Sequence, residues 1–228
     1  MANEIEKVNA IAVADIQAII GKTDGNMEKL MGKEFTGVVD NHVLIEEQVG
    51  FTNQSTITFD ELEQTTYNAL MFQFINIHSD DDNADFRFAS TESDDYQNST
   101  FWEAYHDEAD SAADHEYRPN DDTSLGSGGS AGSETAIAMI ARTLGSGADE
   151  VASGYLWIYG LDNTHNLVKQ WYSVFSSMSY NEYGYQQQAG GSILHDGTST
   201  AAITGIEFTM DSGNFDGTIK LFGLAEAS

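Results

Sequence analysis

From about Phe35 onward the chain alternates apolar and polar residues with a period of two, and no segment there keeps the period of a long helix. Ten such segments occur between turns rich in Gly, Asn, Asp and Ser, at residues 42–49, 55–59, 69–78, 84–90, 135–141, 154–161, 167–178, 183–194, 202–210 and 218–224. Strands joined by such turns are typical of antiparallel sheets, whereas parallel sheets need intervening helices. The pattern therefore predicts an all-β domain over residues 37–228, an antiparallel jelly roll or β-sandwich.

One predicted strand, at residues 154–161, is apolar on both faces. Tyr155, Trp157 and Tyr159 share one face, and Leu156 and Ile158 share the other. Strands buried on both faces have near-continuous apolar sequences. We therefore expect both faces of this strand to be covered.

Residues 1–36 contain three copies of an eleven-residue repeat, each with two apolar residues three positions apart. The pairs are Ile5 with Val8, Ile16 with Ile19, and Met27 with Leu30. Capping residues precede the second and third copies and glycines follow them, so each copy is predicted to form one short helical turn. Such turns are unstable alone. We expect an anchoring arm whose apolar pairs dock on another subunit or a neighbouring protein; alternatively, they pack on the chain's own domain.

Charge narrows the choice of partners. The chain has 37 acidic against 9 basic residues, a formal net charge of −28, which repels phosphate backbones and anionic membranes. Fifteen acids and two arginines lie in residues 80–122, which run into a Gly/Ser-rich stretch at 120–133. This stretch could be a linker between two domains, but we expect a long exposed loop, because the strands on either side share one character. The N-terminal residues lack the apolar core of an export signal, and no run of 18 apolar residues occurs. Neither a nucleic-acid partner nor membrane insertion is expected.

Two candidate binding sites follow from residue type. Asp80, Asp82 and Asp85 could supply oxygen ligands for Ca²⁺, although the glycine and terminal glutamate of an EF-hand loop are missing; the alternative is a solvated acidic turn. Tyr180, Tyr183 and Tyr185 lie beside several amides and could stack on sugar rings, or they could be ordinary half-buried strand residues.

Catalytic chemistry has little support in the sequence. The chain has no cysteine, which removes disulfides, thiol nucleophiles and zinc–thiolate sites. Among so many acids, some carboxylate pair will have glycosidase spacing by chance. We therefore expect neither an enzyme nor a cofactor, with calcium as the one ion to consider.

Several segments resemble virion structural proteins of marine tailed phages, especially those infecting cyanobacteria. In the arm these are residues 5–9, 13–16 and 26–32; in the β domain they are residues 72–78, 101–110 and 206–223. The first repeat ends in Asn9-Ala10, where the family usually has Asn-Gly. The resemblance implies a virion component, assembled in the host cytoplasm and attached to other virion proteins of the tail or capsid. We further expect it to be a homo-oligomer.

The function predicted from these features is that of a non-enzymatic phage structural protein, displayed on the particle and anchored by its arm. The tail-fibre or adhesin type, which would contact a host surface glycan, is favoured over a capsid decoration. The alternatives are a soluble, lectin-like carbohydrate-binding module and a polysaccharide depolymerase.

Overall fold

A computed structural model describes most of the β domain and short parts of the arm. The described residues are 7–8, 11–12, 29–30, 33–34, 42–62, 67, 69–91, 95–109, 111–119, 137–160, 168–195 and 203–224. The chain divides into two compact units, essentially residues 1–41 and residues 42–226. The boundary predicted between residues 36 and 37 lies outside the described residues.

The first unit contains two very short antiparallel ladders. β1 (Lys7–Val8) pairs with β2 (Ile11–Ala12), and β3 (Lys29–Leu30) pairs with β4 (Lys33–Glu34). Most of the predicted helical repeat falls on residues outside the described ones, so the repeat stays a prediction.

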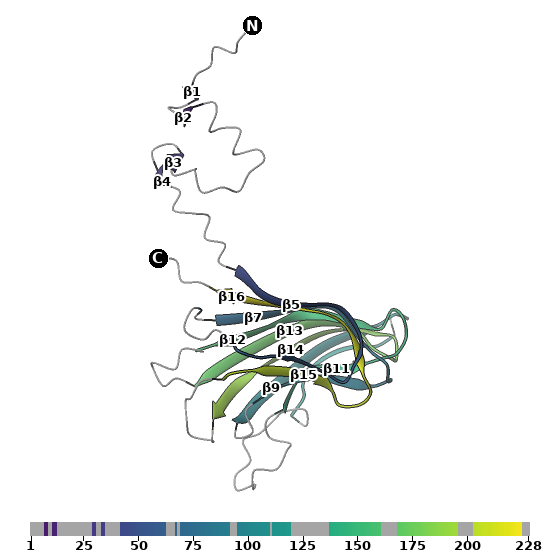
Figure 1. Ribbon diagram of the computed structural model, residues 1–228. Helices are drawn as coiled ribbons and strands as arrows, with labels where there is room; N and C mark the ends of the chain where they lie inside the picture. The colour runs from purple at the N-terminus through teal and green to yellow at the C-terminus, as the bar shows by residue number, and fades with distance from the viewer. Residues whose placement is uncertain are drawn as a thin grey trace. The chain divides into compact units, whose positions relative to one another are not determined.

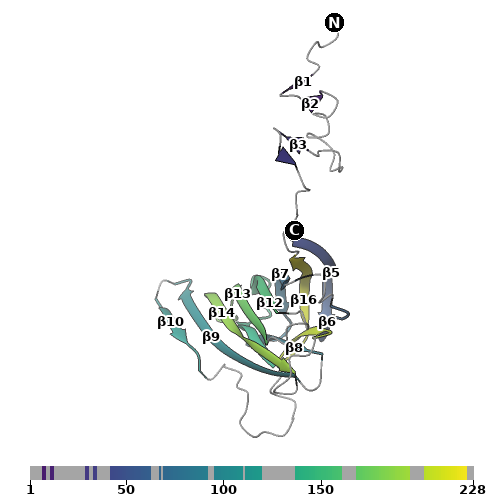
Figure 2. The same cartoon turned by 90° about the vertical axis from the view of Figure 1, so that its left-hand side faces the viewer.

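The second unit is all-β and sandwich-like, with two antiparallel sheets (Figure 1). The eight-stranded sheet has the order β10-β9-β14-β13-β12-β7-β16-β5, and Figure 2 shows these strands side by side. Its strands are β5 (His42–Gln54), β7 (Ala69–Ser79), β9 (Asp95–Asp107), β10 (Ala113–Tyr117), β12 (Val151–Tyr159), β13 (Lys169–Met178), β14 (Tyr183–His195) and β16 (Phe215–Leu224).

The four-stranded sheet has the order β11-β8-β15-β6. Its strands are β6 (Thr56–Phe59), β8 (Ala84–Ser90), β11 (Ile137–Leu144) and β15 (Ile206–Met210). Among the described residues, no helix connects the strands of either sheet. None of these residues forms a helix that could cross a membrane. The all-β, antiparallel prediction is therefore confirmed.

Two strands lie where the sequence predicted a long loop. β9 and β10 lie within residues 95–117, where no strand was predicted, so reading the acidic stretch there as a loop is wrong; the strand predicted at 84–90 within the same stretch is confirmed. The Gly/Ser-rich stretch at 120–133 lies outside the described residues, so the loop predicted there stays a prediction. The inward positions of β9 include buried polar side chains, namely Gln97, Ser99 and Glu103. Because these residues are not apolar, the strand lacks the alternation by which the other strands were recognised.

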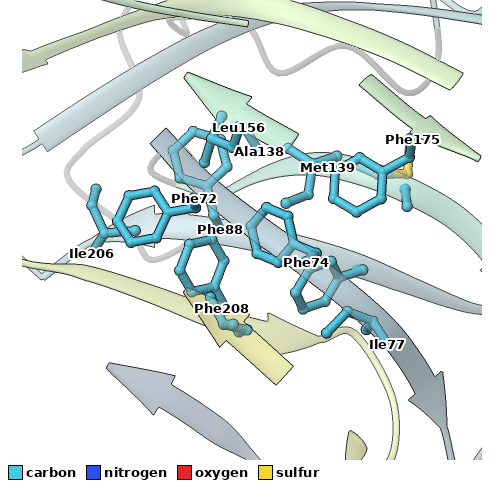
Figure 3. Packing of buried hydrophobic residues seen from close by; sticks show 14 of the residues in the cluster. Phe72, Phe74, Ile77, Phe88, Ala138, Met139, Leu156, Phe175, Ile206 and Phe208 are labelled. Atoms are coloured by element: carbon cyan, nitrogen blue, oxygen red, sulfur yellow. The ribbon is translucent and has the colours of Figure 1, made fainter. Parts of the chain in front are cut away.

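The core between the sheets is built largely from phenylalanine. Phe208 on β15 lies at its centre, with ring centroids 5.0 Å from Phe72 and 5.1 Å from Phe74, both on β7 (Figure 3). Phe88 on β8 meets Trp171 on β13 at 4.9 Å. Strand alternation places these rings on the facing sides of the two sheets. The opposite side of the larger sheet is therefore free of the core.

Candidate functional site

The larger sheet presents exposed aromatic side chains on the face away from the core, called here the outer face. Tyr155 and Tyr159 on β12, Tyr172 on β13 and Trp102 on β9 are 42%, 43%, 41% and 54% exposed. Leu156, on the other side of β12, is fully buried. The expectation that residues 154–161 are covered on both faces is therefore wrong, because the second sheet covers only one.

Strand register arranges part of the outer face into a cross-strand row. Tyr155 lies opposite Val174, Val174 opposite Gln188, Gln188 opposite Trp102, and Trp102 opposite Tyr117. The rings of Trp102 and Tyr117 are 5.0 Å apart between centroids. This row, called the aromatic wall, crosses β12, β13, β14, β9 and β10.

A parallel row of small and polar side chains runs beside the wall. It consists of Ser153, Ser176, Gln186, Ala104 and His115, each opposite the next. Two shallow hollows lie along it, of about 430 Å³ over β12 to β14 and about 240 Å³ over β14 to β10, and both are lined by Gln186. The small side chains leave open the space that the wall residues fill. We call this row with its two hollows the groove.

Over β9, β12, β13 and β14, the described outward positions carry no acid or lysine. Charged side chains lie at the margins of this area: Lys220 on β16 pairs with Glu47 on β5 at 3.1 Å. Glu116 on β10 lines the smaller hollow and pairs with Arg118 at 2.6 Å. Outward positions of β9 from residue 98 to 106, and of β12, β13 and β14 over residues 153–159, 170–178 and 184–192, hold no Asp, Glu, Lys or Arg. In a chain of net charge −28, the acidic excess therefore lies elsewhere. Such a face favours ligands that carry little charge.

Directly behind the wall, a buried ion cluster holds β9 in place. The side chain of Glu103 is fully buried, and its Oε1 accepts hydrogen bonds from Arg118 Nε at 2.7 Å and Arg142 Nη1 at 3.0 Å. Arg118 follows β10, whereas Arg142 lies on β11 of the other sheet. A buried carboxylate needs such partners. Glu103 therefore fixes the strand on whose opposite face Trp102 stands.

The side chain of Gln187 makes a second link between the sheets. Its Oε1 accepts from the Arg142 amide at 3.1 Å, and its Nε2 donates to the Arg142 carbonyl at 3.3 Å. Both backbone groups belong to β11, which is an edge strand of the smaller sheet. The side-chain amide of Gln187 thus provides hydrogen-bond partners for the backbone N–H and C=O of an edge strand, which no neighbouring strand pairs at this position.

The predicted sugar-stacking tyrosines do not lie together on one exposed surface. Tyr180 is exposed in the turn between β13 and β14, whereas Tyr185 is buried on the inward side of β14. The Tyr183 and Tyr185 rings instead pack with Tyr105, each 5.4 Å from it. Burial raises the pKa of Tyr185, with the nearby Glu103 charge acting in the same direction. Their glycan role stays a prediction.

The predicted calcium residues hold three different segments together. Asp80, Asp82 and Asp85 each accept a hydrogen bond from a backbone amide of another part of the chain. The donors are Asn214, Ser146 and Thr143, respectively, at 2.6, 3.0 and 3.1 Å. Hydrogen bonds from Ser146 lower the pKa of Asp82, and burial raises the pKa of Asp85. Since no three acidic or histidine side chains converge among the described residues, the structure gives calcium no support.

The predicted anchoring residues lie mostly beyond what the structure describes. Val8 and Leu30 belong to β1 and β3. The others, Ile5, Ile16, Ile19 and Met27, are outside the described residues. Their anchoring role stays a prediction.

Sequence reasoning missed the groove, although part of its signal was visible. The alternation of Tyr155, Trp157 and Tyr159 was clear, but it was interpreted as evidence of burial. Trp102 lay in the acidic stretch taken for a loop. The outward Ser and Gln positions of β13 and β14 were the clue that this sheet face meets water.

Comparison of the chain with protein-family models gives no match. No curated protein and no solved structure matches it either.

Proposed function

We propose that the chain is a non-enzymatic structural protein of a bacteriophage virion, displayed on the particle surface and anchored by residues 1–36. The observation that carries the display role is the uncovered outer face: the sandwich encloses its own core between two sheets and leaves a surface with exposed aromatic side chains free. The arm repeats and the resembling strand segments support the virion assignment.

Within this proposal the sandwich is a jelly roll of the tail-fibre or adhesin type. Large exposed aromatic side chains on a folded domain indicate a contact surface. A capsid decoration, the second placement, would use such a surface on neighbouring capsid subunits. The groove, whose two glutamates are paired with arginines, is better suited to a target outside the particle, because capsid contacts of a protein of charge −28 would be expected to use its acids.

A depolymerase lacks its catalytic groups at the groove. Glycoside hydrolysis uses two carboxyl groups on either side of the bond to be cleaved. Two glutamates line the smaller hollow, and both are engaged: Glu103 is held by two arginines on the inward side, and Glu116 is paired with Arg118 at 2.6 Å. Binding without cleavage is therefore the activity that the geometry favours.

The arm provides the test of this proposal. Deleting residues 1–36 should leave a protein that still shows a cooperative unfolding transition and a β-type circular dichroism spectrum, but that no longer copurifies with particles. The triple variant Val8→Ser, Ile19→Ser and Leu30→Ser should also lose copurification with particles. The control variant Lys22→Ser and Lys29→Ser should retain it.

Two outcomes would count against the proposal. Normal incorporation of the arm-deleted protein would refute the anchor. Absence of the full-length protein from purified particles, together with sugar binding that is independent of the arm, would instead support the soluble lectin. Light scattering of the full chain tests the expected homo-oligomer.

A further inference from the structure

We infer that the groove binds a neutral glycan chain, with the aromatic wall packing on sugar rings and the amides and hydroxyls beside it binding sugar hydroxyls. This inference builds on the proposed display role, since it names the ligand class of the displayed face. It concerns a set of residues different from Tyr180, Tyr183 and Tyr185.

The aromatic wall supplies surfaces for sugar rings. One side of a pyranose ring presents mainly C–H groups, whose partial positive charge is attracted to the negative face of an aromatic ring. Tyr155 and Trp102 stand three strand spacings apart in the same row, which is about 14 Å. A ligand that touches both must be a chain of several sugar units.

The polar side chains beside these rings match the rest of a sugar. Gln186 Nε2 donates to Ser176 Oγ at 2.8 Å, which orients the amide and leaves its carbonyl oxygen available as an acceptor. The side-chain amide of Gln188, between Trp102 and Val174, makes no hydrogen bond to another described residue. Its amide can therefore both donate to and accept from a ligand. Aromatic rings beside amides and hydroxyls fit a molecule that presents both C–H faces and hydroxyl groups.

The shape of the groove favours a chain over a compact ligand. Both hollows are open to solvent, and they meet at Gln186, which lines each of them, so a ligand can extend from one hollow into the other. Pockets for small molecules, by contrast, enclose most of the ligand's surface. A glycan chain can lie across the strands and extend beyond the sheet.

Charge argues against other occupants. An acidic polysaccharide or a second copy of the chain would bring like charge to a protein of net charge −28. A basic protein would be attracted to unpaired carboxylates, and the two glutamates among the described lining residues of the hollows, Glu103 and Glu116, are both paired with arginine. A neutral glycan requires no charge partner on this face.

Affinity electrophoresis of the full chain tests the inference. The acidic protein is run in native gels containing dextran, laminarin, mannan or agarose, with alginate as the acidic comparison. At least one neutral polysaccharide should retard the protein. Trp102→Ala should weaken the retarding affinity about tenfold, the size expected for one lost aromatic contact. Trp102→Phe should retain most of the binding.

Two more variants separate the groove from the rest of the surface. Ala104→Glu places a carboxylate in the exposed floor and should weaken binding without changing the unfolding temperature. Tyr180→Ala removes a similarly exposed aromatic ring from a turn outside the groove, and should leave binding unchanged.

Several results would overturn the inference. These are retardation by none of the neutral polysaccharides, retardation by alginate alone, or equal losses for Trp102→Ala and Tyr180→Ala. Self-association in light scattering that disappears in Trp102→Ala would assign the face to a second copy. The electrophoresis uses the purified protein, whereas the arm deletion is tested on particles. A negative result in either experiment therefore leaves the result of the other unaffected.

Discussion

Removal of the Phe208 ring is the sharpest test of how the two sheets pack. The side chain is fully buried on β15, and its ring centroid lies 5.0 Å from Phe72, 5.1 Å from Phe74, 5.9 Å from Phe86 and 6.1 Å from Phe59. Phe208→Ala would leave a cavity that all four neighbours border.

The expected cost is about 4–5 kcal/mol, in the upper half of the range for buried Phe→Ala substitutions. Three of these ring pairs are edge-to-face, and such pairs contribute about 0.5–1.5 kcal/mol each beyond area burial. The site also has little freedom to collapse, because β15 is paired with β6 on one side and β8 on the other.

Urea unfolding of the full chain, followed by tryptophan fluorescence, measures this loss. Buried Trp171 packs on Phe88, so its emission reports the core directly. Phe222→Ala, at a half-buried outward position of β16, is the matched control and should cost much less. The slope of unfolding free energy against urea should stay unchanged. If Phe208→Ala costs no more than Phe222→Ala, the packing described around Phe208 is wrong.

Further variants probe single contacts. Burial raises the pKa of Asp85 above its ordinary value of 3.8, so the folded state holds the proton of this carboxyl more tightly than the unfolded state does. The stability that this group contributes is therefore lost as the pH rises from 3.8 through the raised pKa. Asp85→Asn should remove this loss, which is measured as the difference between the urea midpoints at about pH 4 and about pH 7. Glu103→Leu leaves Arg118 and Arg142 without their carboxylate and should cost about 3 kcal/mol in the same unfolding assay. Gln187→Ala removes two hydrogen bonds to β11, and should speed hydrogen exchange of the Arg142 amide and cost about 1–3 kcal/mol.

The strands were largely predictable because their signal is local. Segments such as Ala84–Ser90 alternate so regularly that the predicted and observed bounds coincide. β9 could not be recognised, because the carboxylate of Glu103 is buried only by virtue of arginines that come later in the chain. No local pattern distinguishes such a glutamate from one in a solvated loop.

The candidate site was less predictable because it depends on register. Trp102 and Gln188 become neighbours through the pairing of β9 with β14, across more than eighty residues of chain. The aromatic face of β12 was visible, but whether it is covered depends on whether a third layer packs on the larger sheet. The two sheets of this unit leave that face exposed, which follows from the whole topology rather than from β12 itself.

The pairing of β5 with β16 has a mechanical consequence for a tethered protein. β5 is an edge strand that begins at His42, directly after the first unit, and its ladder with β16 runs from His42–Leu224 to Phe215–Gln54. Its side chains are mostly exposed, including Val43, Leu44 and Val49, so the strand is held chiefly by that ladder. A pull through the arm therefore reaches β5 first. Tension along the strand loads many hydrogen bonds of the ladder at once, whereas tension perpendicular to the strand breaks them one after another. β5 therefore resists detachment most strongly when the force acts along its axis.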